Sequence, residues 1–339
     1  MSCELKIRQF DQSEWNQLIA ESPDLCLQQL WQYGEAKQQI GSWQTVRMVF
    51  LQNEKIVGAA QAALRLIPII NMGLIWLSRA PLILDTETEN KDLLTAQILE
   101  QLKKYWVDQK RLYLRIAPSF SFSAANEQLV KKLGYKMTTK NQGWTSYKLD
   151  LSLTLEVLES QFRKNWRQCL KKSQDLGVKV TSNGTDEIMR TFISDLESLI
   201  ENKKLKTSAT PTLIKAIYDF SRNENTLQIY SADVDGRHLG SIIIAYYGKT
   251  GFYLAGAVNE EGRRSGANHN LLWHAVTMAK SSGYRWFDVG GAHPINTPPG
   301  ILYFKQGLGG QQYQLFPEIE AYSPGLVYKL LNRIISNKR

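Results

Sequence analysis

The chain has 339 residues, a length typical of two domains rather than one. With 43% hydrophobic and 22% charged residues, 23 glycines and 10 prolines, its composition is that of a globular protein and excludes a disordered or collagen-like chain. Lys and Arg outnumber Asp and Glu by 41 to 32, and this formal charge of +9 favours nucleic acid, phosphate-bearing substrates or an anionic membrane as partners, although an ordinary basic protein carries the same excess.

The cysteines and the hydropathy pattern indicate a cellular compartment. Cys3, Cys26 and Cys169 are too few and too far apart for a disulfide framework, which predicts a reducing environment. The first ten residues lack the apolar core of a signal peptide, and the longest apolar run, between Arg65 and Arg79, is shorter than the roughly 20 residues of a membrane-spanning helix. We therefore expect a cytoplasmic protein.

In chain order, the sequence predicts the same unit twice. A turn at 52–55 precedes two strands, a helix and a strand, at 56–68, 73–83, 93–108 and 111–118. A turn at 233–236 precedes the same order, at 238–248, 251–258, 268–283 and 284–291. We expect an α/β (α+β) fold in which each half has a mixed, twisted sheet flanked by helices.

A long basic helix over 155–176, ended by Gly177, is predicted between the two units, and a further helix over about 186–201. Four basic residues of the first helix fall on one face at helical spacing: Arg163, Lys164, Arg167 and Lys171. Such a stripe suits a tRNA backbone, because neutralised phosphates give salt-dependent, largely sequence-independent binding. A solvated helix face is the alternative.

Three segments of the chain together resemble the FemABX family, the aminoacyltransferases that extend peptidoglycan precursors with amino acids from aminoacyl-tRNA. They are LQQLWQYGEAKQQIGSW, WRQCLKKSQDLGVKV and, most specifically, DVGGAHPINTPPGILYFKQGLGGQQYQLFPE. The resemblance implies two GNAT-like domains, residues 1–149 with 317–339 and residues 150–316, with the end of the chain packed on the first domain.

The resemblance also implies a reaction, in which a stem-peptide amine attacks the ester of aminoacyl-tRNA. This reaction needs alignment and oxyanion stabilisation rather than a metal or a cofactor. Lys305, which precedes three glycines that let a ligand approach closely, would stabilise the oxyanion or the tRNA end, and the backbone of Phe304 would hold the acceptor. The alternative is a surface lysine beside a flexible turn. This hypothesis requires the ammonium to face a groove, and it fails if the ammonium is buried or turned toward bulk solvent with no groove beside it.

By the same resemblance, Lys37 would contact the precursor's diphosphate and Tyr253 would line the substrate cleft. Asp288 is a further candidate for substrate binding, because strand ends beside glycines such as Gly290 and Gly291 are common site positions. Each has a structural alternative: a solvated helix lysine, a core aromatic ring and a turn carboxylate. One departure concerns a phosphate-binding Arg of the family, which has no clear counterpart here. The nearby substitutes are Lys203, Lys204 and Lys206.

Two other functions stay open. The segment Arg263-Arg264-Ser265-Gly266-Ala267-Asn268 is close to the loop with which GNAT enzymes hold the pyrophosphate of CoA at a helix start, although it ends in Asn. A CoA-dependent N-acyltransferase acting on a sugar or amine is therefore the alternative, and a non-catalytic tRNA- or precursor-binding protein is the third. The sequence contains no metal-ligand cluster, Walker A loop or Gly-x-Ser-x-Gly elbow.

The last fifteen residues, GLVYKLLNRIISNKR, form a short basic amphipathic pattern. Such a helix packs on its own domain or rests on an anionic membrane, where a lipid-linked rather than nucleotide-linked muropeptide precursor would be found. Peripheral contact with the inner face of the plasma membrane is thus an alternative to a purely cytoplasmic location. The sequence does not show which amino acid is transferred or the oligomeric state.

Overall fold

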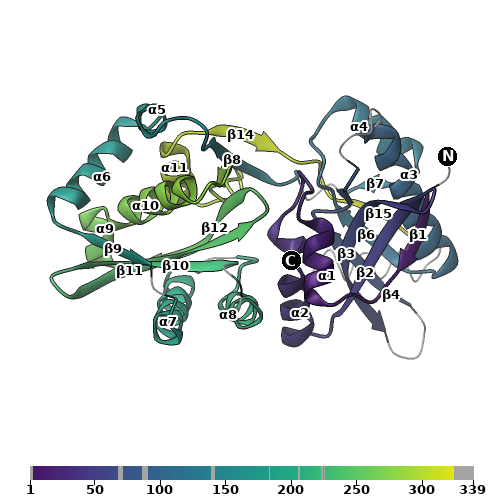
Figure 1. Ribbon diagram of the computed structural model, residues 1–339, viewed down its shortest axis with the longest axis horizontal. Coiled ribbons are helices and arrows are strands. Elements are labelled where there is room, and N and C mark those ends of the chain that lie inside the picture. Colours follow the sequence, from purple (N-terminus) through teal and green to yellow (C-terminus); the bar gives the residue numbers. More distant parts are fainter. Residues whose placement is uncertain are drawn as a thin grey trace. The chain divides into compact units, whose positions relative to one another are not determined.

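The computed structural model describes residues 3–67, 72–85, 91–138, 142–182, 184–204, 207–222, 224 and 226–323. The chain divides into two compact units, Met1–Trp144 with Gln314–Arg339, and Thr145–Tyr313 (Figure 1). The sequence predicts that the chain passes from the first unit to the second between residues 149 and 150 and returns between residues 316 and 317. The first crossing lies earlier because residues 145–150 form a strand that pairs within the second sheet.

The first unit is built on an eight-stranded mixed sheet. Its strands lie in the order β1 (Glu4–Ile7), β2 (Gln44–Gln52), β3 (Lys55–Ile67), β4 (Met72–Ser78), β6 (Tyr113–Ala117), β15 (Ile319–Ala321) and β7 (Lys136–Met137), and β5 (Leu82–Ile83) pairs with β3. Strands β4 and β6 are parallel, whereas the other pairings described for this sheet are antiparallel.

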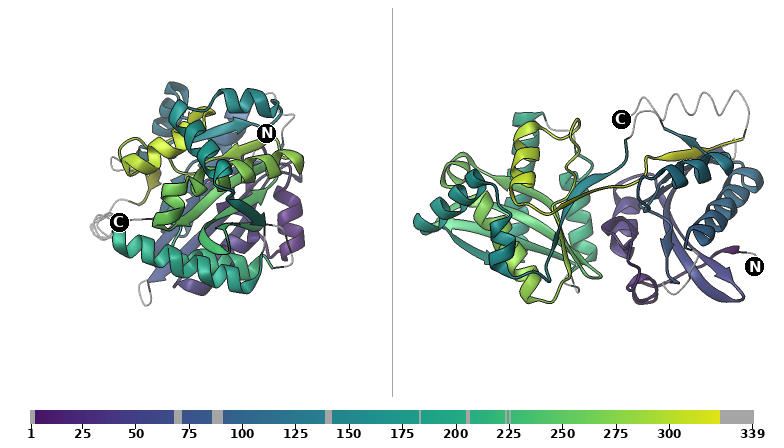
Figure 2. Two further views of the ribbon diagram at one scale, coloured as in Figure 1. Left: turned by 90° about the vertical axis from the view of Figure 1, so that its left-hand side faces the viewer. Right: turned by 90° about the horizontal axis from the view of Figure 1, so that it is seen from above.

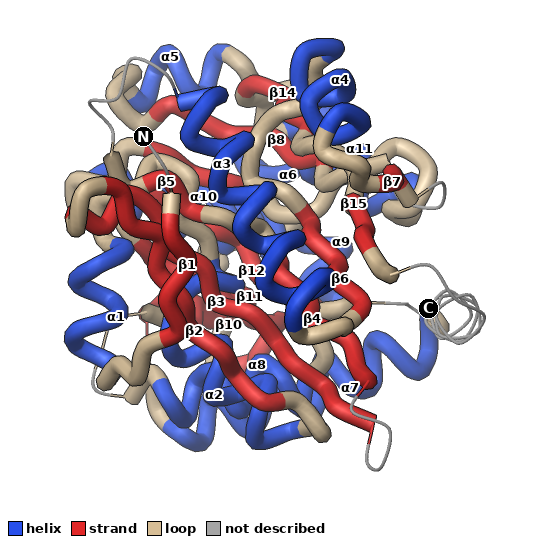
Figure 3. The backbone as a smooth tube through the Cα atoms, turned by 90° about the vertical axis from the view of Figure 1, so that its right-hand side faces the viewer, coloured by secondary structure: helices blue, strands red, loops and turns tan. Residues whose placement is uncertain are grey.

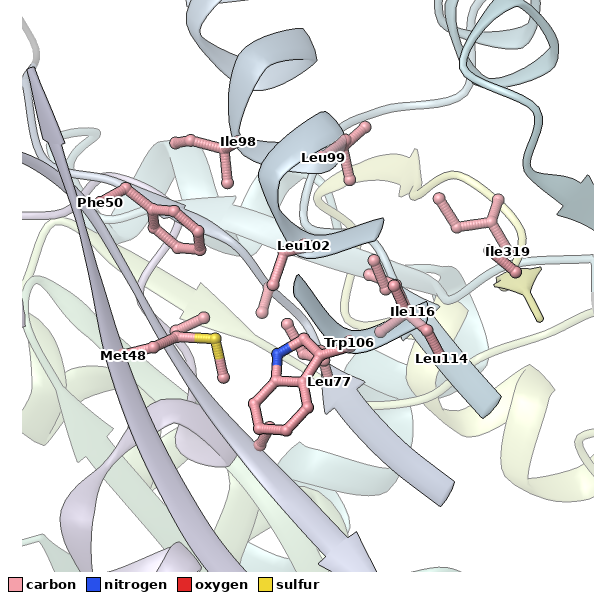
Figure 4. Close-up of a cluster of buried hydrophobic side chains, with 14 of the residues drawn as sticks. Met48, Phe50, Leu77, Ile98, Leu99, Leu102, Trp106, Leu114, Ile116 and Ile319 are labelled. Atoms are coloured by element: carbon pink, nitrogen blue, oxygen red, sulfur yellow. The ribbon is translucent and has the colours of Figure 1, made fainter. Parts of the chain in front are cut away.

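Helices cover both faces of this sheet (Figure 3). They are α1 (Gln12–Ile19), the short 3-10 helix η1 (Leu27–Gln29), α2 (Trp31–Ile40), α3 (Lys91–Lys103), which continues into the π-helical turn η2 (Lys104–Gln109), and α4 (Ala124–Lys132). Helix α3 lies across the strands, and its Ile98, Leu99 and Leu102 pack into a core with Met48 and Phe50 (Figure 4). This burial of large apolar side chains stabilises the unit.

The second unit has a seven-stranded sheet in the order β14 (Gln311–Gln314), β8 (Thr145–Asp150), β13 (Trp286–Asp288), β12 (Thr250–Val258), β11 (Arg237–Tyr247), β10 (Leu227–Val234) and β9 (Lys179–Ser182). Helices α7 (Asp186–Lys203) and α8 (Pro211–Phe220) cover one face. The other face carries α6 (Lys164–Asp175), α10 (Ala267–Ser281) and α11 (Pro299–Gly307), with α5 (Leu155–Ser160) and α9 (Glu260–Ser265) beside them (Figure 1).

The predicted fold class, mixed sheets flanked by helices in both halves, is confirmed. The single long helix predicted over 155–176 is wrong, because the chain breaks it into α5 and α6 at Gln161–Arg163. Arg163 has an extended backbone, and its N–H donates to the Gly307 carbonyl oxygen at 2.9 Å. Gly177, with φ +70°, follows the end of α6 as predicted.

Each sheet contains a strand from a distant part of the sequence. Strand β15, close to the end of the chain, inserts between β6 and β7, whereas β8 lies between β13 and β14. The segments that contain β8 and β14 run alongside each other (Figure 2). The predicted amphipathic helix over 325–339 lies outside the described residues. None of the helices in the described ranges is both long and apolar enough to cross a bilayer.

Candidate active site

The parallel strands β12 and β13 part in the middle of the second sheet. They pair from Thr250 against Trp286 to Phe252 against Asp288, and no further. Side chains at the carboxyl ends of parallel strands meet at one edge, where α/β proteins commonly bind ligands. Tyr253 and Asp288 lie at this point, and Lys305 reaches it from α11. Three residues predicted from the sequence are thus brought together.

The Lys305 ammonium points into the protein. Its Nζ donates to the Gly291 carbonyl oxygen at 2.8 Å and lies 5.3 Å from the centroid of the Tyr253 ring. Lys305 is only 7% exposed, so the expectation that it faces an open groove is wrong for this structure. Burial lowers the pKa of Lys305 to about 8, while the charge of Asp288 acts in the opposite direction. The same burial raises the pKa of Tyr253 to about 12.

Asp288 is 4% exposed, and hydrogen-bond donors occupy both carboxylate oxygens. Oδ1 accepts from Ser146 Oγ at 2.5 Å and from the Gly290 N–H at 2.8 Å, and Oδ2 accepts from the Tyr313 hydroxyl at 2.5 Å. Asp288 therefore anchors the turn after β13, as the structural alternative predicts. Its contact with substrate stays a prediction.

Ser146 and Tyr313 belong to the site although no motif marks them in the sequence. Ser146 lies on β8 and Tyr313 on β14, so both are brought to Asp288 by the strand order of the sheet. Ser146 Oγ also bonds to the Gly290 carbonyl oxygen at 2.7 Å. The sequence held no signal for either residue, because their role depends on which strands become neighbours.

Phe304 joins α11 to an aromatic cluster. Its carbonyl oxygen accepts from Trp166 Nε1 at 3.1 Å, and its ring lies 6.3 Å from the Trp166 ring and 5.0 Å from the His269 ring. Burial lowers the pKa of His269 to about 4, so this imidazole is neutral near pH 7. The backbone of Phe304 is thus bound to α6, and its predicted role in holding the acceptor stays a prediction.

The glycines after Lys305 make room for the chain itself. A Cβ on Gly307 would lie 2.5 Å from Trp166 Cδ1, and a Cβ on Gly309 would lie 2.8 Å from Gln161 Cβ. Gly309 and Gly310 also have φ near +88°, which few other residues adopt readily. The expectation that these glycines admit a ligand is therefore replaced by a packing role against α5, α6 and β8.

The basic stripe of α6 lies on its exposed face, opposite the buried Trp166 and Leu170. Arg167 is tied down, because its guanidinium donates to the carbonyl oxygens of Glu159 and Ser160. Arg163 Nη2 donates to Gln306 Oε1 at 3.2 Å. For the remaining two of the four side chains, no hydrogen-bond or ion-pair partner is found among the described residues. These two are Lys164 and Lys171.

Lys37 lies in the first unit, on α2, and is half-buried. It lines a small pocket together with Tyr33, Thr45, Gln61 and Trp76. Burial lowers the pKa of Lys37. Within the described ranges this ammonium has no hydrogen-bond or ion-pair partner. A half-buried cation without a partner is a candidate contact for an anion.

The motif around Lys37 fastens α2 to the sheet. Glu35 forms an ion pair with the buried Arg47 at 2.8 Å, and the Arg47 guanidinium lies 5.2 Å from the centroid of the Trp31 ring. Gly34 is needed because its Cβ would lie 2.5 Å from Gln61 Oε1, which accepts from Arg47 Nε at 2.9 Å. Arg47 and Gln61 were not predicted, since nothing in the sequence pairs them with α2.

The near-CoA segment begins α10, and α6 covers it. Gly266 has φ +78°, and a Cβ there would collide with the Cys169 carbonyl oxygen of α6. The Trp166 ring lies 5.0 Å from the His269 ring in the first turn of α10. Asn270 Nδ2 donates to the Val178 carbonyl oxygen at 3.0 Å, just beyond α6. The first turn of α10 is therefore packed against protein.

Other predicted cations lie elsewhere. Lys203 ends α7, Lys204 is in the left-handed conformation that follows it, and Lys206 lies outside the described residues. Arg222 follows α8 and is paired with Asp186 and Asp219, at 3.0 and 3.2 Å. Among the described residues, no three His, Cys, Asp or Glu side chains are grouped as metal ligands.

Comparison with known proteins finds two family models that match the chain. Residues 10–204, more than half of the chain, match the FemAB family, and residues 160–306 match the acetyltransferase (GNAT) domain. A protein named Lipid II:glycine glycyltransferase, from Staphylococcus epidermidis, is 21% identical over 93% of this chain and 92% of its own.

Solved structures share the fold. The crystal structure of FemX, 17% identical, matches 96% of this chain and 99% of its own with a TM-score of 0.81. A tandem GNAT protein from the clavulanic acid biosynthesis pathway, 14% identical, matches 96% of this chain and all of its own with a TM-score of 0.53.

Proposed function

The chain belongs to the FemAB family and is an acyltransferase, and from this premise we propose that it transfers an amino acid from aminoacyl-tRNA to the stem-peptide amine of a peptidoglycan precursor. The relative whose name states a glycyl transfer to lipid II matches nearly the whole chain, which supports a precursor as acceptor. No cofactor takes part in this proposal, since the ester of the donor is already activated.

The reaction exchanges one acyl bond for another. The acceptor nitrogen forms a bond to the ester carbonyl carbon, and the bond from this carbon to the ribose oxygen breaks. The proton lost by the nitrogen passes to the departing ribose oxygen, so atoms and charge balance without an external reagent. The protein's contribution is to align two large substrates and to stabilise the oxyanion between the two steps.

Lys305 is the proposed donor to that oxyanion. Its ammonium has three donor hydrogens, and Gly291 is the one hydrogen-bond acceptor found for it among the described residues. Because the ammonium is buried rather than beside an open groove, the proposal requires an opening for the oxyanion. We place it at Gly290, whose missing Cβ would lie 3.3 Å from Nζ, beside the Tyr253 ring. A positive charge in such a buried setting stabilises a developing anion more strongly than it would in water.

Lys37 is the proposed contact for the diphosphate of the precursor. The pocket of the first unit places this unpartnered ammonium beside Thr45, Gln61 and the ring of Trp76. A compact ammonium is a suitable phosphate ligand, and burial strengthens the attraction between them. Whether the phosphate carries a nucleotide or a lipid is decided by the experiment below.

The position of α6 is the observation that favours tRNA over CoA as donor. The GNAT domain match raises the CoA alternative. In GNAT enzymes the pyrophosphate of CoA lies on the N–H groups at a helix start. Here α6 packs on the start of α10, with Cys169 against Gly266 and Trp166 against His269. A pyrophosphate could reach those N–H groups only if α6 moved away.

A donor-exchange experiment tests the proposal. The purified protein is incubated with aminoacyl-tRNA carrying radiolabelled glycine, alanine or serine, or with radiolabelled acetyl-CoA, and with either the UDP-linked or the lipid-linked pentapeptide precursor. We expect label in the precursor from aminoacyl-tRNA, and the better acceptor identifies the linkage. Label from acetyl-CoA without tRNA would overturn the proposal in favour of a CoA-dependent N-acyltransferase.

The proposed location follows from the acceptor. A precursor of either kind is available at the cytoplasmic side of the membrane, so we propose a cytoplasmic protein with peripheral contact at the inner face of the plasma membrane. Fractionation of cells that express the tagged protein tests this location. Recovery in a compartment outside the plasma membrane would contradict it.

A further inference from the structure

A half-exposed aromatic ring lies where α11 meets the first turn of α6. Tyr303, on α11, is 49% exposed. The Arg163 guanidinium lies 5.2 Å from the centroid of its ring, and Asn165 Nδ2 donates to its hydroxyl at 3.2 Å. Both neighbours come from the start of α6, so the ring is held at two points while much of it remains open to solvent.

Arg163 is itself fixed in place. Its backbone N–H donates to the Gly307 carbonyl oxygen at 2.9 Å, and Nη2 donates to Gln306 Oε1 at 3.2 Å. The guanidinium therefore adds a positive charge to the ring without swinging away from it. A rigid aromatic side chain with an adjoining cation has little ordering entropy left to lose when a planar ligand stacks on it.

The surroundings of the ring carry positive charge that no ion pair among the described residues neutralises. Lys164 follows Arg163 directly, and Lys171 lies two turns further along the same exposed helix. The described residues provide neither lysine with an ion-pair partner. A fixed aromatic surface that continues into a row of cations fits unpaired bases followed by a phosphate backbone, because every base presents a π-face.

We propose that Tyr303 is a stacking site for an unpaired base near the 3′ end of the donor RNA, with the strand continuing along Lys164 and Lys171. This inference rests on the proposed function for the identity of the RNA. Tyr303 stands two residues before Lys305 in α11, with its ring exposed where Lys305 is buried. Residues two apart on a helix leave it on nearly opposite sides, so the strand must pass around α11 between the base on Tyr303 and the ester at Lys305. The stacked base therefore lies upstream of the esterified nucleotide.

A lipid surface is the competing occupant, since Ile295 and Ile301 near α11 are also exposed. The pairing of Arg163 and Asn165 with the ring favours RNA. A ring that enters a bilayer interface needs no fixed polar partner at its hydroxyl and no guanidinium on its face, whereas base stacking gains from both. Vesicle binding is included below as an arm of the test.

The test compares two fluorescent RNA hairpins in an anisotropy titration, one ending in unpaired ACCA at its 3′ end and one blunt. Tyr303→Ala is expected to weaken binding of the ACCA hairpin by roughly tenfold, within the range that base–aromatic stacking supplies, and to leave the blunt hairpin unchanged. Tyr303→Phe keeps the ring and should stay within about threefold of wild type. Phe122→Ala removes a 51% exposed ring from the first unit as the matched control.

Equal weakening of both hairpins, or none, by Tyr303→Ala would overturn the stacking site. Binding of the Tyr303 ring to phosphatidylglycerol vesicles, lost in Tyr303→Ala while RNA binding is unchanged, would assign the surface to lipid instead. Transfer from aminoacyl-tRNA by the wild-type protein is measured separately. If the wild-type protein transfers from aminoacyl-tRNA but Tyr303→Ala binds the ACCA hairpin normally, only this inference is refuted. If Tyr303→Ala selectively loses binding of the ACCA hairpin but the wild-type protein transfers only from acetyl-CoA, only the proposed function is refuted.

Discussion

The two units have the same strand order but differ in how far their central parallel strands pair. In the first unit, the parallel strands β4 and β6 pair over five positions, from Leu74 against Tyr113 to Ser78 against Ala117, and the segments beyond them stay joined. The Ala80 N–H donates to the Ala117 carbonyl oxygen, and Ser119 Oγ donates to the Pro81 carbonyl oxygen at 2.7 Å. In the second unit the pairing stops after three positions.

This difference shows which copy carries the candidate chemistry. Lys305 lies where the strands of the second unit part, and no carboxylate among the described residues is bonded to its ammonium. The oxygens of Asp288 accept from other donors. The first unit also buries charge, but there Arg115 and Glu318 are bonded directly to each other at 2.5 Å. We infer that the Arg115–Glu318 pair is architectural in the first unit, whereas Lys305 is the candidate reactive charge of the second.

The largest expected effect concerns the architectural charge. Glu318→Gln leaves the Arg115 guanidinium buried without its anionic partner, and should lower the free energy of unfolding by about 3–5 kcal/mol. Urea denaturation followed by tryptophan fluorescence measures the loss. The double variant Arg115→Met, Glu318→Leu removes both charges and should recover most of the stability. A loss below 1 kcal/mol would show that this pair does not hold the first unit together.

The next effect concerns the reactive charge. Lys305→Ala should lower turnover by roughly 10²–10³ at saturating substrate, because the oxyanion loses its donor. Lys103→Ala is the matched control, since Lys103 Nζ in the first unit also donates to a backbone carbonyl oxygen, that of Leu133, at 2.7 Å. Turnover is measured by transfer of labelled amino acid. Normal turnover in Lys305→Ala would place this lysine among the architectural residues.

A smaller effect tests the packing role of the glycines in the second unit. Gly307→Ala places a Cβ against Trp166 and should destabilise the protein by about 1–3 kcal/mol, as overpacking does. Gly300→Ala lies in the same helix with nothing within 4 Å of the added carbon, and should leave stability unchanged or slightly raised. Thermal unfolding compares the two variants. Equal stability in both variants would show that α6 does not pack closely against α11 at Gly307.

The smallest effect is a shift in pH dependence. Lys305 stabilises an anion only while protonated, so turnover should fall as pH rises through about 8. Asp288→Asn removes a negative charge that raises this pKa, so the alkaline limb should move to lower pH. The pH profile of kcat in wild type and variant measures the displacement. If the alkaline limb stays in place or moves to higher pH, the Asp288 carboxylate does not raise the pKa of Lys305.

Local patterns predicted much of the fold. Strand alternation and helical spacing located most of the central strands and helices of both units, because these signals depend on neighbouring residues alone. The break between α5 and α6 is not predictable from the local pattern, which is continuously helical. At the break, the N–H of the extended Arg163 donates to the Gly307 carbonyl oxygen, a contact from a distant part of the sequence. Tertiary contacts overrode propensity at that point.

The candidate site was predictable to a smaller extent. Lys305, Tyr253 and Asp288 were singled out through short motifs, and the structure brings them together. The direction of the Lys305 side chain was not predictable, because it depends on the parting of β12 and β13. Ser146 and Tyr313 were missed for the same reason, since strands more than a hundred residues apart in sequence carry them to one carboxylate.

The insertion of β15 between β6 and β7 has a consequence for biosynthesis. A ribosome makes the chain from its amino terminus, and domains generally begin to fold as they emerge. The first sheet cannot close until Ile319–Ala321 have been made, whereas every strand of the second sheet is complete once Gln314 has appeared. The unit that is translated first is therefore the one that finishes folding last, and until then it exposes the unpaired edges of β6 and β7 to chaperones and proteases.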